Sequence, residues 1–170
     1  MIYIAAPFFN PDQLEAVKTV EQILTRFNLD FFSPRLHGVD VSTLTEAERK
    51  SSSRMRDIFV GNIDAMYLSK FMLACIDDKD QGTNFEIGWF HSNWFLWTQK
   101  YKCPEIVTWS RAGAKTNLMI QQAVGGHCAT LVNLNRFIDW TVNSDEAMNV
   151  SWRVCTEKYN HFDLIDLKEG

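Results

Sequence analysis

Short apolar runs alternate with longer segments of helical periodicity along most of this chain, and this alternation restricts the possible folds. The runs with the length of strands are 1–5, 29–32, 71–76, 105–109 and 129–134. The segments with helical spacing are 10–27, 43–68 with a break near 51–53, 83–101, 116–124 and the part that follows 135. Strands joined by helices pair in parallel, because a parallel pair needs a crossover connection. The sequence therefore predicts an α/β fold: a doubly wound, mainly parallel five-stranded sheet with helices on both faces.

Two of the expected helices have recognisable starts. Asn10 is a good N-cap residue, Pro11 suits the first helical position, and Asp12 complements the helix dipole. Thr43 and Glu46 have the spacing of a capping box, so we expect the next helix to begin there.

Composition excludes several classes of protein. The chain has 170 residues, 46% of them hydrophobic, which is typical of one globular domain, predicted here to span 1–170. Its net charge of −4 lacks the basic excess of a nucleic-acid-binding protein. No apolar run has the length of a membrane span, and residues 1–5 lack the basic region of a signal peptide. We expect no nucleic acid and no membrane among its partners.

The cysteines and histidines are too scattered to suggest a metal site. No Cys-x-x-Cys pair occurs, and Cys75 and Cys128 lie in apolar runs that predict buried free thiols. Free thiols fit a reducing cytoplasm. The chain also lacks the glycine-rich motifs that bind dinucleotides and triphosphates. We therefore expect a cytoplasmic protein with neither metal nor cofactor.

An acidic loop follows the third expected strand. It contains Asp77, Asp78 and Asp80, turns at Gly82 and leads to Glu86 in the first turn of the next helix. The carboxyl ends of strands are where open α/β sheets bind ligands, so this loop is the leading candidate for a site. The alternative is purely structural, with Thr83 as the helix N-cap, Glu86 as its capping-box partner and the aspartates in a solvated turn.

Four separate segments carry a resemblance to a known family. They are an opening strand with an aromatic loop at 2–10, a helical segment at 57–66, the pattern Asp-x-Gly-Thr-x-x-Glu-x-Gly at 80–88, and residues 116–119. Together they resemble the nucleoside 2-deoxyribosyltransferase family over about residues 1–120, and the third segment is the most specific. The resemblance implies a flavodoxin-like sheet and transfer of 2-deoxyribose between nucleobases. Residues 135–170 match the family poorly.

The resemblance also implies roles for individual residues. Glu86 matches the nucleophile that forms a covalent glycosyl-enzyme, and Tyr3 matches a tyrosine that orients it, although a strand tyrosine can also be simply a core residue. Asp80 matches a residue that binds sugar hydroxyls. Asn117 matches one that a neighbouring subunit contributes, which implies at least a dimer; otherwise it only begins a helix.

Other residues complete the expected substrate site. Phe8 and Phe9 lie where the family places aromatic rings against the base, and we expect one of them to pack in the core and the other to face the pocket. Gly82 and Asp77 belong to the same acidic loop and join the expected substrate-binding residues. The segment 89–97 is unusually aromatic, which predicts core packing plus a subunit interface, with His91 as a packing residue.

One position departs from the family pattern. Asn62 stands where the best-known members carry an aspartate that assists the leaving base, and an amide cannot give up a proton. Asp64 lies two residues on, roughly opposite on a helix, so both cannot face one site. Asp77 or Asp78 is the alternative source of the proton.

Three other functions stay open. A hydrolase of nucleoside 5′-monophosphates would need a cationic or hydroxyl-rich phosphate site, for which Ser110, Arg111, Lys115 and Thr116 are candidates, although Asp80 would repel phosphate. A catalytically silent nucleoside-binding protein would explain Asn62 but not an intact Glu86. A purely structural protein leaves the acids of the loop unexplained.

Overall fold

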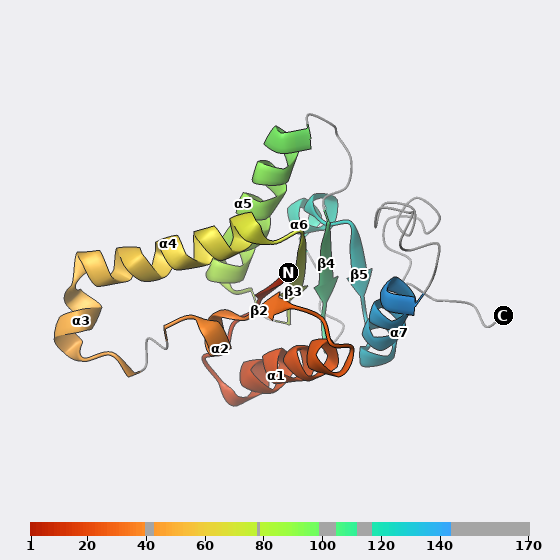
Figure 1. Ribbon diagram of the computed structural model, residues 1–170, viewed down its shortest axis with the longest axis horizontal. Helices are drawn as coiled ribbons and strands as arrows, with labels where there is room; N and C mark the ends of the chain where they lie inside the picture. Colours follow the sequence, from red (N-terminus) through yellow and green to blue (C-terminus); the bar gives the residue numbers. More distant parts are fainter. Residues whose placement is uncertain (40–42, 78, 99–104, 112–116, 144–170) are drawn as a thin grey trace.

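The computed structural model describes residues 1–39, 43–77, 79–98, 105–111 and 117–143, with only the backbone described for 94–98. Within these ranges, five strands form one sheet: β1 (Ile2–Ala5), β2 (Phe31–Phe32), β3 (Phe71–Cys75), β4 (Ile106–Trp109) and β5 (Gly126–Cys128). Their order is β2-β1-β3-β4-β5 and every neighbouring pair is parallel. This is the flavodoxin-like order, so the predicted fold class is confirmed (Figure 1).

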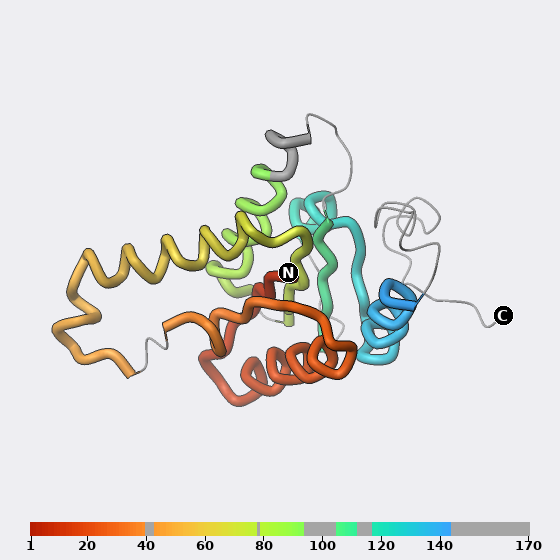
Figure 2. Tube along the Cα trace, viewed as in Figure 1, coloured from red at the N-terminus to blue at the C-terminus, as the bar shows by residue number. Residues whose placement is uncertain are grey.

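Helices cover both faces of the sheet. They are α1 (Pro11–Arg26), α2 (Pro34–His37), α3 (Glu46–Lys50), α4 (Ser52–Leu68), α5 (Gln81–Thr98), α6 (Leu118–Ala123) and α7 (Leu131–Asn143). Figure 1 shows α1 and α7 together on one side of the sheet, with α4, α5 and α6 on the other. The chain trace in Figure 2 shows α3 and the first half of α4 reaching well beyond the sheet.

The alternation of side chains along β1 divides the core into two layers. Ile2 and Ile4 pack with residues of α1 and α7, whereas Tyr3 and Ala5 pack with residues of α4 and α5. Because β1 pairs with both β2 and β3, it is buried on both faces and at both edges. The second residue of this strand, Tyr3, is thereby directed toward α5.

The starts of two helices confirm one prediction and correct another. Asn10 caps α1 as expected, with its Oδ1 accepting from the Gln13 N–H at 2.9 Å. The capping box predicted at 43–46 is wrong: Thr45 is the N-cap, and its backbone N–H donates to Glu48 Oε2 at 2.8 Å. The predicted break is confirmed, because the helix ends at Lys50 and Ser51 caps α4.

The last expected strand is wrong in position. The strand is Gly126–Cys128, while residues 131–143 form α7, and the Gly125 N–H donates to the Ile106 carbonyl at 2.8 Å. Thr130 caps this helix through a 3.1 Å bond from the Asn133 N–H. A short apolar run is ambiguous between strand and helix, and the buried residues Leu134, Phe137 and Ile138 have helical spacing.

Several smaller expectations concern packing. Cys75 and Cys128 are buried free thiols, as predicted, and burial raises the pKa of each, to about 12 for Cys128. Cys103 and Cys155 lie outside the described residues. His91 Nδ1 lies 2.9 Å from the Ala123 carbonyl and joins α5 to α6, as expected of a packing residue. No helix in the described part of the chain has the length and hydropathy needed to cross a membrane.

The helical register of α7 can be tested by truncating two neighbouring side chains. In a strand, Val132 and Leu134 would share one face, whereas in α7 Leu134 is fully buried and Val132 is 58% exposed. We expect Leu134→Ala to lower the free energy of unfolding by about 2–5 kcal/mol. Val132→Ala should change it by about 0.5 kcal/mol or less in the same urea titration. An equal loss of unfolding free energy from both substitutions would contradict the helical register of α7.

Candidate active site

The centre of the site is a hydrogen bond between β1 and α5. The Tyr3 hydroxyl donates to Glu86 Oε1 at 2.6 Å, although the two residues are 83 positions apart in the chain. Tyr3 is fully buried and Glu86 is partly buried. The buried phenol of Tyr3 holds the carboxylate in one orientation. The hydrogen bond is made to Oε1 and not to Oε2.

The loop before α5 does not form the capping box that the purely structural alternative required of Thr83 and Glu86. Asp80, and not Thr83, caps the helix: the Thr83 N–H donates to Asp80 Oδ2 at 2.6 Å. Because α5 begins at Gln81, Glu86 lies in its second turn and makes no capping box. A Cβ atom at Gly82 would lie 3.1 Å from Asp80 Oδ2, so glycine leaves room for that carboxylate to reach the helix end.

The surroundings of Glu86 change its acidity. The pKa of the carboxyl group is raised to about 7: burial raises it most, the hydrogen bond from Tyr3 lowers it, and the nearby charge of Asp80 raises it by a smaller amount. Burial and then the charge of Glu86 raise the pKa of Tyr3 well above its ordinary value. Tyr3 therefore remains a donor at every physiological pH, and Glu86 is poised between its two protonation states near neutrality.

A pocket of about 790 Å³ opens beside these groups. The predicted site residues among its described lining are Phe8, Phe9, Asn62, Asp80, Gly82 and Glu86. Further lining residues that the sequence interpretation missed are Ala6, Leu14, Lys18, Pro34, Arg35, Gly38, Val39, Arg49, Ile58 and Thr83. The pocket lies at the carboxyl ends of β1, β2 and β3, which is the edge predicted for a ligand.

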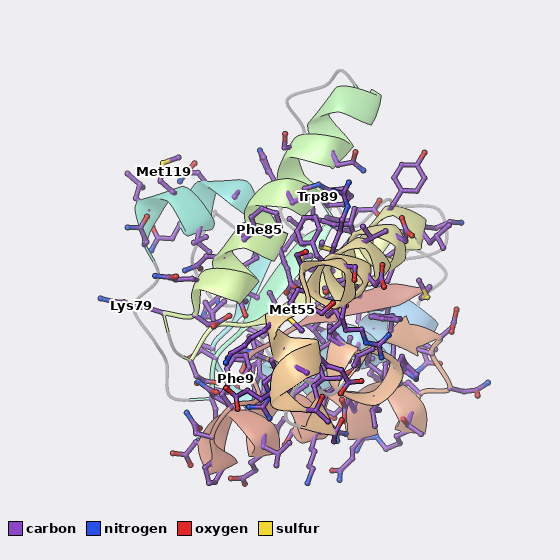
Figure 3. All side chains as sticks on the ribbon, turned by 90° about the vertical axis from the view of Figure 1, so that its left-hand side faces the viewer. Phe9, Met55, Lys79, Phe85, Trp89 and Met119 are labelled. Atoms are coloured by element: carbon purple, nitrogen blue, oxygen red, sulfur yellow. The ribbon has the colours of Figure 1, made fainter. Side chains whose placement is uncertain are left out.

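Aromatic side chains form part of the pocket wall. The rings of Phe8 and Phe9 stack with centroids 5.3 Å apart, and both residues line the pocket. Phe8 also packs against the core, whereas Phe9 is 77% exposed. Figure 3 shows Phe9 below Phe85 and Trp89, which lie along α5.

Some predicted residues lie elsewhere. Asp77 is not among the described residues that line the pocket, and its Oδ1 accepts from the Ser110 hydroxyl at 3.2 Å. Asn117 caps α6 through a 2.8 Å bond from the Met119 N–H and is likewise absent from the described lining. Asp64 is exposed, as expected if Asn62 faces the site. Asp78 lies outside the described residues.

The missed lining residues come from several parts of the chain, and one group of them follows β2. Pro34, Arg35 and Gly38 follow β2, in a segment from which no substrate-binding residue was predicted. The available signal was the position of this segment at the carboxyl end of the second expected strand, because that end of a parallel sheet is where ligands bind. Ile58 and Arg49 come from α4 and α3, and their approach to the pocket depends on how those helices pack.

Comparison with known proteins agrees with the motifs. Residues 2–96 match the family model described as nucleoside 2-deoxyribosyltransferase. This match spans more than half of the chain. The protein belongs to the nucleoside 2-deoxyribosyltransferase family. The resemblance inferred from the four segments is thereby confirmed, and the matched range includes both partners of the Tyr3–Glu86 hydrogen bond.

Solved structures extend the likeness beyond residue 96. A 2-deoxyribosyltransferase from the psychrotolerant bacterium Bacillus psychrosaccharolyticus is 26% identical, with a TM-score of 0.63 over 86% of this chain and 93% of that one. A conserved protein from Enterococcus faecalis V583 is 16% identical, with a TM-score of 0.58 over 81% of this chain and 96% of that one, which shows a shared fold. A search of curated proteins found no match.

The acidity of Glu86 in this family member can be measured without substrate. We expect its carboxyl carbon to titrate near pH 7 in an NMR experiment on protein carrying ¹³C-labelled glutamate. Tyr3→Phe removes a hydrogen bond that stabilises the carboxylate, so the pKa should rise by about one unit. Glu86→Gln identifies the resonance by its loss. A Glu86 pKa near 4.5, or one that Tyr3→Phe lowers, would contradict this description.

Proposed function

We propose that this protein transfers 2-deoxyribose from one nucleobase to another, with Glu86 as the nucleophile. The observation that carries the proposal is the hydrogen bond of 2.6 Å that holds Glu86 on Tyr3 at the wall of an open pocket. Membership of the family and the likeness to a solved 2-deoxyribosyltransferase support it.

The reaction has two displacements at the same carbon. Glu86 Oε2, which does not accept from Tyr3, attacks C1′ of the donor, the C1′–N bond breaks, and the base leaves with the bonding electrons. The product is a glycosyl ester of Glu86. A ring nitrogen of the acceptor base then attacks C1′ from the face that the first base left, which breaks the ester and restores the carboxylate. The acceptor base gives up its N–H proton, and the anion of the first base takes up a proton through solvent. Two inversions give overall retention.

The surrounding residues suit the parts of such a substrate. Asp80 carries a carboxylate that can accept hydrogen bonds from sugar hydroxyls beside Glu86. Phe8 and Phe9 offer ring faces to a planar base. Gly82 supports the site by leaving space for Asp80. We assign Asp77 to the supporting structure, because its Oδ1 accepts from Ser110 and it is outside the described lining.

Asn62 gives this family member an unusual leaving-group environment. Its amide lines the pocket, where it can donate a hydrogen bond to the departing base but cannot transfer a proton. A base that leaves without protonation carries negative charge, so its departure depends on hydrogen-bond donors and cations in the pocket wall.

The competing functions have less support. Arg111 pairs with Asp12 at 3.2 Å and with Glu15 at 2.8 Å, and the Ser110 hydroxyl donates to Asp77, so neither joins the described pocket lining as a phosphate ligand. Lys115 and Thr116 lie outside the described residues. A silent binding protein would have no need for a glutamate whose pKa is about 7 and whose orientation is held by a buried tyrosine.

We also propose that the active protein is a homo-oligomer in which Asn117 reaches the pocket of a neighbouring subunit. Asn117 is outside the described lining of the pocket in its own chain. The next residues, Leu118 and Met119, are 65% and 75% exposed, and apolar side chains of that exposure favour a subunit contact.

Base exchange tests the nucleophile directly. Wild-type protein mixed with a 2′-deoxynucleoside and a different free base should form a new deoxynucleoside. Liquid chromatography measures the rate at which this product appears. Glu86→Ala should lower the rate by about a thousandfold or more, because the covalent step is lost. Asp64→Asn, on the exposed side of α4, should retain the rate. Free base without exchange would identify a hydrolase, and no turnover by folded protein would refute an enzymatic role.

Mixed oligomers test the proposed role of Asn117. Glu86→Ala and Asn117→Ala subunits, each weakly active alone, are co-expressed with different affinity tags, and the doubly tagged species is purified. One kind of site in this species combines Glu86 from one subunit with Asn117 from the other. We expect about half of the wild-type exchange rate in a two-fold dimer. A rate no higher than the mean of the two parents would show that Asn117 does not act across an interface.

A further inference from the structure

The pocket wall contains cations that the proposed mechanism does not assign to any particular part of the base. Among the described residues that line it, Lys18, Arg35 and Arg49 carry positive charge. Lys18 is an exposed residue of α1. Arg49 donates from Nε to the Leu44 carbonyl at 3.1 Å. Arg35 differs from both because a buried carboxylate holds it.

That carboxylate belongs to Glu21, which is only 5% exposed. Arg35 donates to it twice, from Nε to Oε1 at 3.1 Å and from Nη2 to Oε2, and the Ser33 hydroxyl donates to Oε1 at 2.6 Å. A buried charge is costly unless it is paired and hydrogen-bonded, so the Glu21 carboxylate and the Arg35 guanidinium hold each other in position. The guanidinium has more N–H donors than this pair uses, and Arg35 also lines the pocket.

The backbone around Arg35 is also constrained. The Ser33 N–H donates to His37 Nδ1 at 3.0 Å, and the His37 N–H donates to the Ser33 carbonyl at 2.8 Å. A Cβ atom at Gly38 would lie 2.4 Å from the Pro34 carbonyl oxygen, so this close turn requires glycine. The Arg35 side chain therefore extends from a short, tightly hydrogen-bonded helix.

The position of this turn relates Arg35 to the nucleophile. Phe32 stacks on Tyr3 with ring centroids 5.8 Å apart, and Tyr3 donates to Glu86. The chain then continues from Phe32 through Pro34 to Arg35 in the pocket wall. Asp80 lies beside Glu86 and suits the sugar, so a base that extends from C1′ toward Arg35 would meet cationic donors and not carboxylates.

We propose that Arg35 recognises O6 and N7 of a 6-oxopurine, which makes it a specificity-determining residue for the function proposed above, on which this inference rests. Glu21 occupies the Nε–Nη2 edge of the guanidinium, and the remaining Nη1–Nη2 edge matches two adjacent acceptors, as O6 and N7 are. Adenine presents a donor in place of O6, so the same contact is lost. The positive charge also favours a purine that leaves with the bonding electrons.

The test compares two deoxyribose donors, 2′-deoxyinosine and 2′-deoxyadenosine, whose bases differ in the group at C6. The measured quantity is the ratio of their kcat/KM values, because this ratio is independent of the fraction of folded enzyme. Wild-type protein should prefer deoxyinosine by about tenfold or more. Arg35→Lys, which keeps the charge beside Glu21 but lacks the planar fork, should bring the ratio close to one. Arg111→Lys, an arginine paired with Asp12 and Glu15 outside the described lining, should leave it unchanged.

A binding measurement separates this inference from the proposed function. Titration calorimetry with free hypoxanthine and free adenine needs no turnover, so tighter binding of hypoxanthine that Arg35→Lys abolishes would support base recognition even in an inactive protein. Equal binding of both bases by the wild type, or a preference that survives Arg35→Lys, would overturn it. An effect of Arg35→Lys confined to the 5′-monophosphates of both purines would also overturn it, because Arg35 would then bind phosphate.

Discussion

The hydrogen bond from Tyr3 to Glu86 depends on nearly every layer of this fold. It requires β1 to be an interior strand whose side chains point alternately to the two faces of the sheet. It also requires α5 to pack on the face toward which Tyr3 is directed. The same packing withdraws Glu86 from water and raises its pKa to about 7. The proposed mechanism requires the ionised form of Glu86, so the orienting hydrogen bond from Tyr3, which favours that form, acts against the cost of burying it.

The pocket lies where the sheet topology separates the chain into two layers. From the carboxyl end of β1 the chain enters α1 on one face, and from the end of neighbouring β3 it enters α5 on the other. Loops that leave adjacent strands in opposite directions leave a crevice between them. The helices α3 and α4 contribute Arg49, Ile58 and Asn62 to this crevice.

Charge is distributed unevenly around that crevice. Asp80 and Glu86 lie at the start of α5, whereas Lys18, Arg35 and Arg49 come from α1, α2 and α3. The two sides are held by different means: Asp80 caps a helix, and Arg35 is held on buried Glu21. An uneven field of this kind suits a substrate with a hydroxyl-bearing part and a part that accepts hydrogen bonds or gains negative charge.

The sequence alone determined the fold class and the start of α1 at Asn10, because periodicity and capping are local properties of the chain. The pattern at 80–88 indicated the family, and two of its residues, Asp80 and Glu86, line the pocket. It misplaced β5 and the capping box of α3. A short apolar run fits a strand and a helix equally well, and neighbouring threonines offer more than one capping-box spacing. Only the tertiary structure decided that Asp80 caps α5, that Tyr3 meets Glu86, and that Glu21 holds Arg35 in the pocket wall. The last two contacts join residues brought together by packing, and a side chain does not specify a distant partner until the core around both has formed.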